Sequence, residues 1–269
     1  MNVVDDNLGF ESVRAWLSSH CAISYPDHKV PLLRQRLVRV TRSFDLPDMT
    51  ALAHGVVTAP REDIQLAVMH AASTNHTYFF REPDVLKKFS DTILPERMSN
   101  STVRIWSAAC STGDEAYSIA ILAAEKFGQT VLNKLQILGT DISAPVVERA
   151  EHGIFPRNQF AHTDPALLQR YFTPTGIDQY LVNPTIRKTC TFRRMNLKAT
   201  PYPFTHRFDI VFCRNILYYF NRSDQIATLE ALYDATLPGG WLITSVTEVI
   251  SDLGTRWQQA DTGVYRRPE

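Results

Sequence analysis

The spacing of apolar residues changes about one third of the way along the chain. Up to residue 88 they recur every three or four positions, as Phe10, Val13 and Leu17 do, which is the spacing of one face of a helix. Beyond that point, short apolar runs alternate with helical stretches. The pattern predicts an all-helical domain over residues 1–88 and an α/β domain over residues 89–269.

Strands are expected where the apolar runs are short and uninterrupted. These runs cover residues 103–108, 135–140, 208–213 and 241–246. Helical periodicity precedes them at 83–97 and separates them at 114–127, 144–152 and 223–237. Strands that alternate with helices predict a doubly wound, mostly parallel sheet.

The interval 155–203 interrupts this alternation. Two short β-prone runs, 179–182 and 186–192, lie between prolines and Gly176. We therefore predict a small antiparallel β-subdomain inserted in the α/β domain, with the tripeptide NPT at 183–185 as its turn.

A candidate ligand site lies where the first strand turns into a helix. Residues 108–113 are small, which lets a ligand approach the backbone. Asp114 and Glu115 follow in the first helical turn, and Asp141 ends the next strand, where nucleotide-binding sheets place a ribose-binding acid. The alternative is an ordinary connection whose acids only cap a helix, but two matched signals favour a ligand site.

Two other segments carry polar groups beside aromatic ones. In the segment STNHTYFFRE, Asn75, Thr77 and Arg81 can donate hydrogen bonds to a ligand. Arg214 and Asn215 follow the strand at 208–213, at the edge where open α/β sheets bind ligands. The tyrosines that come next could form a wall beside a reacting group or simply pack.

Composition narrows the choice of function. The chain has 269 residues, 44% of them hydrophobic, and a formal net charge of +0, so nothing in its overall charge attracts nucleic acid or a membrane surface. Its four cysteines form no CxxC pair, which favours reduced thiols and no metal site. The N-terminus lacks a targeting pattern and no apolar run is long enough to span a membrane, so we expect a cytoplasmic protein.

One predicted helix of the N-terminal part is strongly basic. Its positive side chains include Arg34, Arg36, Arg39 and Arg42. They form either a solvated face or a docking surface for an acidic helical partner.

Four segments, in this order, resemble the bacterial chemotaxis receptor methyltransferases of the CheR family. They are NHTYFFR at 75–81, WSAACSTGDEAYSIA at 106–120, GTDIS at 139–143 and FDIVFCRNILYYF at 208–220. The similarity covers nearly the whole chain, including the helical N-terminal part and the insertion.

The resemblance implies transfer of a methyl group from S-adenosylmethionine to glutamates on the cytoplasmic helices of chemoreceptors, with S-adenosylhomocysteine as product. It implies a cofactor site made of Asn75, Thr77, Arg81, Glu115, Asp141, Asn196, Leu197, Arg214 and Asn215. Within that site Glu115 would take the amino group, Asp141 the ribose and Arg214 the methionine part. Arg81 and Tyr219 would lie closest to methyl transfer, and the basic helix would dock the receptor.

Other interpretations remain. The turn lacks the GxGxxG of a dehydrogenase, and no Asn/Asp-Pro-Pro-aromatic segment of a nucleic-acid amino-methyltransferase follows residue 213. A third interpretation is a sensor that binds the cofactor but has no transfer activity. The sequence SVTEVI at 245–250 departs from the glycine- and serine-containing stretch of many relatives. Some family members tether to a receptor C-terminal pentapeptide through the inserted subdomain, and the short NPT turn favours a member that needs no such tether. We also expect a monomer.

Overall fold

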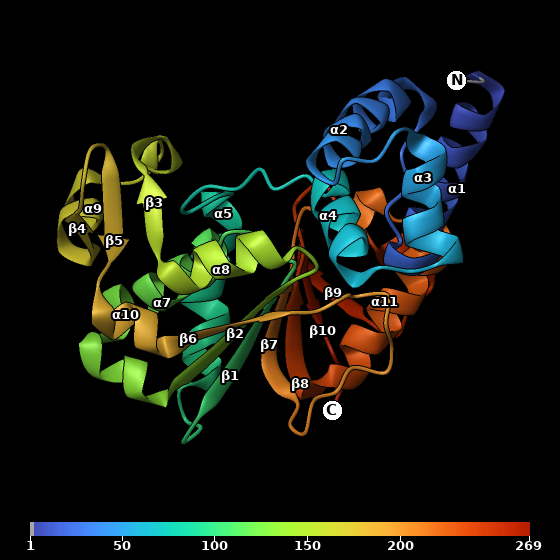
Figure 1. Ribbon diagram of the computed structural model, residues 1–269. Helices are drawn as coiled ribbons and strands as arrows, with labels where there is room; N and C mark the ends of the chain where they lie inside the picture. Colours follow the sequence, from blue (N-terminus) through green and yellow to red (C-terminus); the bar gives the residue numbers. More distant parts are fainter. Residues whose placement is uncertain (1–2) are drawn as a thin grey trace.

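The computed structural model describes residues 3–269, and its N-terminal part is helical (Figure 1). The helices are α1 (Val3–Cys21), α2 (Val30–Ser43), α3 (Met49–Ala53) and α4 (Glu62–Ala72). Their buried side chains form an apolar cluster of their own, which runs from Phe10 to Ala72 in the sequence. Farther along the chain, Phe79 and Leu86 pack instead into the core of the sheet, so the packing changes between Ala72 and Phe79.

The rest of the chain is built on one large sheet with helices packed against it (Figure 1). Its strands are β1 (Val103–Ala108), β2 (Leu135–Asp141), β6 (Cys190–Arg194), β7 (Phe208–Cys213), β8 (Thr236–Ile243), β9 (Gln258–Asp261) and β10 (Val264–Arg266), in the order β6-β2-β1-β7-β8-β10-β9. The first five in that order are parallel to one another, and β10 is antiparallel to both of its neighbours, β8 and β9. The principal helices here are α5 (Pro83–Lys88), α6 (Leu94–Arg97), α7 (Asp114–Phe127), α8 (Ala144–His152) and α11 (Arg222–Ala235). The predicted fold class is confirmed.

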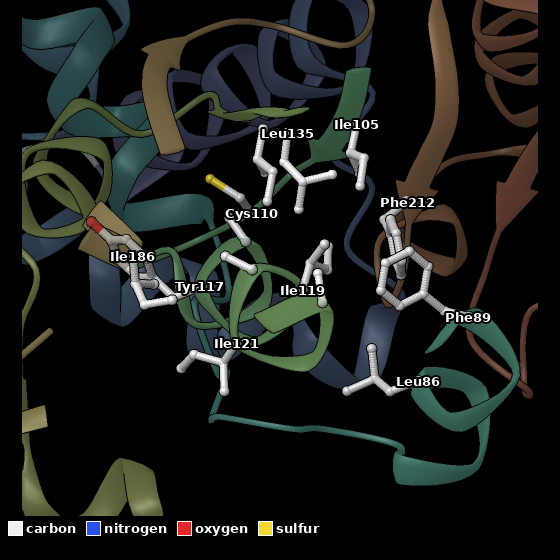
Figure 2. Packing of buried hydrophobic residues seen from close by; sticks show 14 of the residues in the cluster. Leu86, Phe89, Ile105, Cys110, Tyr117, Ile119, Ile121, Leu135, Ile186 and Phe212 are labelled. Carbon is white, nitrogen blue, oxygen red and sulfur yellow. The ribbon is translucent and has the colours of Figure 1, made fainter. Parts of the chain in front are cut away.

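Helix α7 is central to the core of this sheet. Figure 2 shows its residues Tyr117 and Ile119 between Ile186 on one side and Phe89 and Phe212 on the other. The rings of Phe89 and Phe212 meet edge to face at 5.2 Å between centroids. Because α7 is buried on most of its surface, its first turn is held rigidly at the carboxyl end of β1.

A small second sheet confirms the predicted antiparallel insertion, but not all of its strands. The sheet contains β3 (Ile154–Pro156), β4 (Phe172–Pro174) and β5 (Gln179–Val182), in the order β3-β5-β4, with α9 (Pro165–Tyr171) between β3 and β4. The prediction of a strand over 186–192 is wrong. Residues Pro184–Thr189 form helix α10, and β6 then joins the large sheet beside β2.

The error has a local cause. Asn183 caps α10 because its Oδ1 accepts a hydrogen bond from the Thr185 N–H at 2.9 Å, and Pro184 follows at the first helical position. The tripeptide NPT is therefore a helix start, and the hairpin turn of β4 and β5 lies at residues 175–178, where Gly176 has φ +65°. The NPT segment therefore no longer supports a short hairpin turn. It also no longer supports the expectation, drawn from that turn, that the protein needs no pentapeptide tether.

Strand β8 also differs from expectation. It begins at Thr236, and Pro238, Gly239 and Gly240 lie inside it instead of turning the chain into it. The pairing with β7 is irregular there, because Phe208 pairs with Thr236 but Ile210 pairs with Trp241. The strand ends at Ile243, earlier than the predicted residue 246, and residues 244–250 form a loop after it.

Across residues 3–269, none of the helices combines the length and the apolar character that a membrane crossing requires.

Candidate active site

A cavity of about 1030 Å³, its open mouth included, lies at the carboxyl ends of β1, β2 and β7. All ten residues assigned to cofactor binding or methyl transfer by resemblance line it: Asn75, Thr77, Arg81, Glu115, Asp141, Asn196, Leu197, Arg214, Asn215 and Tyr219. They come from segments up to 144 positions apart in the sequence, counted from Asn75 to Tyr219. The fold therefore brings together the whole predicted set.

The turn between β1 and α7 shows why its residues are small. Ala109 and Ser111 have φ values of +60° and +50°, and Gly113 has +89°. Left-handed backbone is unfavourable for large or β-branched side chains, so a run of small residues makes this tight turn possible. It ends on α7 with Asp114 and Glu115 in the first helical turn.

Glu115 and Arg214 form a buried ion pair at the bottom of the site. Arg214 Nη1 donates to Glu115 Oε2 at 2.8 Å, and Ser107 Oγ donates to Glu115 Oε1 at 2.7 Å. The Arg214 side chain is 2% exposed, and its buried Nε has no partner among the described residues. A carboxylate and a cation paired in the wall of a cavity suit a ligand that itself carries an ammonium and a carboxylate.

Glu82 also contacts Arg214, and sequence reasoning missed it. Its carboxylate lies 3.4 Å from Arg214 Nη2 and accepts from Asn215 Nδ2 and Ser245 Oγ, both at 2.9 Å. Burial opposes ionisation of Glu82, but the Asn215 hydrogen bond and the Arg214 charge outweigh it and lower its pKa. Glu82 has φ +56°, a left-handed conformation that these contacts hold in place.

Glu248 is a second residue that sequence reasoning missed. Its carboxylate accepts the backbone N–H of Asn215 at 2.7 Å and that of Leu217 at 2.8 Å. Burial raises the pKa of Glu248, and these N–H groups oppose the rise. Glu248 therefore fixes the turn after β7, where Asn215 has φ +60°.

Asp141 ends β2 with its carboxylate bound to backbone. It accepts from the N–H of Ser111 at 2.9 Å and from that of Ser143 at 3.0 Å. Burial raises its pKa, and the two N–H groups oppose the rise. Asp141 thus joins the β1–α7 turn to the β2–α8 turn.

Asp114 is fully buried and has a structural position. Thr112 Oγ1 donates to it at 2.6 Å and Gln159 Nε2 at 3.0 Å, so it ties the turn to the insertion. It does not line the cavity, whereas the adjacent Glu115 does. Burial raises the pKa of Asp114 to about 7.

The raised pKa of Asp114 predicts a pH-dependent stability. Asp114 binds its proton more tightly in the folded chain than in the unfolded chain, where its pKa is about 3.8. Its contribution to the free energy of unfolding is therefore complete below pH 3.8 and is lost as the pH rises through 7. Asp114→Asn should remove roughly 3 kcal/mol of the stability loss between pH 5 and pH 8. Urea unfolding at both pH values measures this. Equal losses in the wild type and the variant would contradict it.

Arg81 and Tyr219 lie at the mouth of the cavity. Arg81 Nη1 donates to the His76 carbonyl at 2.9 Å, and its guanidinium lies 5.9 Å from the centre of the Tyr78 ring. Tyr219 contacts Tyr218 with 4.4 Å between ring centroids. The Arg81 backbone carbonyl also accepts from Arg214 Nη2 at 2.5 Å, so the mouth and the buried ion pair are directly linked.

The N-terminal helices contribute to the cavity, which the sequence did not predict. Cys21 and Ile23 line it. Asn196 Nδ2 donates to the His20 carbonyl at 2.6 Å, and Ser24 N–H donates to the Tyr219 carbonyl at 3.0 Å. No local pattern signals such contacts.

The four arginines of the basic helix α2 are not equivalent. Arg34 pairs with Asp6 at 3.2 Å, and Arg36 Nη1 donates to the Tyr25 hydroxyl and the Ser73 carbonyl, both at 3.1 Å. Arg39 and Arg42 are exposed and form no ion pair with any described residue. Arg36 therefore supports the segment that begins at Ser73, and only Arg39 and Arg42 are free for a partner.

Two buried cysteines, Cys21 and Cys110, line the cavity and pack into the apolar clusters. Burial raises the pKa of the Cys110 thiol well above its usual value, so Cys110 in the turn is a packing residue. Within residues 3–269, no group of three or more His, Cys, Asp or Glu side chains has the arrangement of a metal site.

The fold and the cavity define an α/β cofactor-binding protein of the S-adenosylmethionine-dependent methyltransferase type, with an acid after β2 and only one glycine in the first turn. Residues 75–265 match the family model described as CheR methyltransferase, SAM binding domain. The chain belongs to the CheR methyltransferase family, and S-adenosylmethionine is its cofactor.

Relatives agree over almost the whole length. The chain is 32% identical to chemotaxis protein methyltransferase Cher2 of Pseudomonas putida, over 94% of each chain. It is 31% identical to chemotaxis protein methyltransferase 1 of Pseudomonas aeruginosa, over 97% of this chain and 98% of the relative. Among solved structures, N-methyltransferase NodS from Bradyrhizobium japonicum has a TM-score of 0.41 and 14% identity, over 71% of this chain and all of that one.

Proposed function

We propose that the protein methylates glutamate side chains on the cytoplasmic helices of chemoreceptors. The observation that carries the proposal is the buried Glu115–Arg214 pair at 2.8 Å, in a cavity whose mouth holds Arg81 and Tyr219. The names of the relatives support chemotaxis as the setting.

The residues fit S-adenosylmethionine in three places. Glu115 would accept from its ammonium group, and Arg214, which pairs with Glu115 in the cavity wall, would contact its methionine part. Asp141 would accept from the ribose hydroxyls. Asn75 and Thr77 would add contacts from the segment after α4, and Asn196 and Leu197 would bound the adenine side.

S-adenosylmethionine supplies an electrophilic methyl group on a sulfonium sulfur. A glutamate carboxylate with an ordinary pKa of about 4.3 is ionised at neutral pH, so it can attack the methyl carbon without losing a proton. The C–O bond forms as the C–S bond breaks, and the sulfur keeps the electron pair. The protein therefore needs no general base, only orientation and exclusion of water.

Arg81 and Tyr219 have positioning tasks in this proposal. The guanidinium of Arg81 at the mouth can hold the incoming carboxylate in line with the methyl group. The ring of Tyr219 closes the side of the cavity and limits the access of water.

The decisive experiment is incubation with labelled S-adenosylmethionine and a panel of chemoreceptor cytoplasmic fragments. The proposal expects base-labile methyl esters on the fragments. Cofactor binding without any label would favour the alternative, a sensor without transfer activity.

Charge reversal on α2 should slow receptor methylation. Arg39→Glu with Arg42→Glu should lower kcat/KM for a receptor fragment by about tenfold at low salt and less at high salt, because screening weakens exposed charge pairs. The affinity for S-adenosylmethionine should not change, because both side chains are exposed and Arg36 is left in place. Methylation rates at two salt concentrations measure this, and a loss that is independent of salt would contradict it.

A further inference from the structure

A second cavity shares the segment 75–78 with the cofactor cavity. It has a volume of about 1170 Å³, its open mouth included, and residues of α4, α8 and β3 also line it (Figure 1). All four residues of the segment line both cavities: Asn75, His76, Thr77 and Tyr78. The segment is therefore a common wall, and we call the second space the side cavity.

The side cavity is lined by basic groups and by no acid. Four side chains that can carry a positive charge line it: His70, His76, Arg149 and His162. None of the described lining residues is aspartate or glutamate, and Arg149 is exposed and forms no ion pair within residues 3–269. The buried Asp114 lies behind this wall, where Thr112 and Gln159 donate to it. A concave wall of this kind attracts an anion.

His70 and Arg149 lie close together in this wall. The Nδ1 of His70 is 2.7 Å from Ser143 Oγ, which leaves its Nε2 for a ligand. Burial lowers the pKa of His70, and the charge of Arg149 lowers it further. A guanidinium and an imidazole from two different helices can bind several oxygens of one phosphate group.

The same cavity has an aromatic part. The ring of Tyr78 lies 5.3 Å from that of His162 and 6.1 Å from that of His76, between centroids. Val146 and Phe155 add apolar surface. Rings and apolar side chains beside a cationic wall suit a ligand in which a flat ring is joined to a phosphate.

The side cavity is linked to the cofactor site by two hydrogen-bonded paths. On one path, the His76 carbonyl accepts from Arg81 Nη1 at 2.9 Å. On the other, Ser143, which contacts His70, donates its N–H to Asp141 at 3.0 Å. A ligand that fixes the wall of the side cavity therefore also fixes residues that line the cofactor cavity.

We propose that the side cavity binds a nucleotide, a flat ring joined to phosphate, and that this second ligand strengthens cofactor binding. Arg149 and His70 would hold the phosphate, and Tyr78 and His162 would contact the ring. Because both ligands contact the segment 75–78, each stabilises the conformation that the other needs. By linkage, the gain in affinity is the same in both directions.

The test uses guanosine monophosphate and uridine monophosphate as probes, and inorganic phosphate as the probe without a ring. The cofactor cavity is first filled with S-adenosylhomocysteine, so that the nucleotides cannot enter it. Calorimetry compares the wild type with Arg149→Gln, His162→Ala and the matched control Arg39→Gln. Arg39 has the same charge and is also exposed, but it lies on α2 and does not line the side cavity.

The wild type should bind at least one of the two nucleotides with a Kd below about 1 mM and inorganic phosphate at least about tenfold more weakly. Arg149→Gln should weaken nucleotide binding about tenfold, the scale of one charge-assisted hydrogen bond, and His162→Ala about threefold. The control should match the wild type. A saturating nucleotide should lower the Kd of S-adenosylhomocysteine about threefold in the wild type and have no effect in Arg149→Gln.

Failure of both nucleotides to bind, equally tight binding of inorganic phosphate, or equal nucleotide affinity in Arg149→Gln and the wild type would overturn the site. Nucleotide binding that leaves the Kd of S-adenosylhomocysteine unchanged would overturn the coupling. These measurements contain no receptor and no methyl transfer, so their outcome is distinct from failure of the proposed function.

Discussion

Arg214→Met should lower the free energy of unfolding by about 3–5 kcal/mol, because one buried cation balances two carboxylates. Glu115 and Glu82 both lie within 3.4 Å of its guanidinium, and methionine would leave both carboxylates without this counter-ion. The variant should also lose measurable affinity for S-adenosylmethionine. Urea unfolding and calorimetric titration with the cofactor measure the two effects.

Arg222→Met is the matched control for this variant. Arg222 forms an ion pair with Asp252 at 3.7 Å, but its side chain is 64% exposed, and exposed pairs contribute about 1 kcal/mol at most. The control should therefore bind the cofactor like the wild type. If Arg214→Met were no less stable than Arg222→Met, the buried pair would not have the importance given to it here.

Glu115→Gln should weaken S-adenosylmethionine binding by about 10- to 100-fold, because a charged acceptor for an ammonium group becomes a neutral one. The amide oxygen can still accept from Arg214 while the amide NH2 donates to the Ser107 hydroxyl, so both hydrogen-bond contacts can be kept. Asp114→Asn changes the adjacent acid, which does not line the cavity, and should change affinity less than threefold, or about 0.6 kcal/mol. Calorimetry of both variants decides the assignment, and equal losses would refute it.

Much of the fold follows from local pattern. The predicted boundaries of β1, α7, α8 and β7 agree with the structure, because buried parallel strands read as apolar runs and their helices are amphipathic. The prediction of a strand over 186–192 was wrong because the composition of this run suits a strand, whereas Asn183 and Pro184 start a helix just before it. The start of β8 depends on its pairing with β7, which is distant in the sequence. The irregular register of that pairing accommodates the Pro-Gly-Gly segment within β8.

The candidate site divides in the same way. Acids and donors that directly follow strands could be found, since position at the edge of a sheet is a local property. Glu82 and Glu248 could not, because their importance depends on contacts with Arg214 and Asn215 more than 30 positions away. The hydrogen bond of Arg36 could not be predicted for the same reason, since its partner Ser73 is 37 positions distant.

Residues 20–25 have a consequence for how far the two halves of the chain are modular. They form the end of α1 and the start of the connection to α2. They hydrogen-bond to Asn196 and Tyr219 and add Cys21 and Ile23 to the cavity wall. A chimera that exchanged the helical part for that of a relative would therefore exchange part of the cofactor pocket as well. If the helical part also binds the substrate, as the proposed function expects, substrate preference and cofactor affinity would be coupled traits, and each could be altered alone only by substitutions that leave this connector intact.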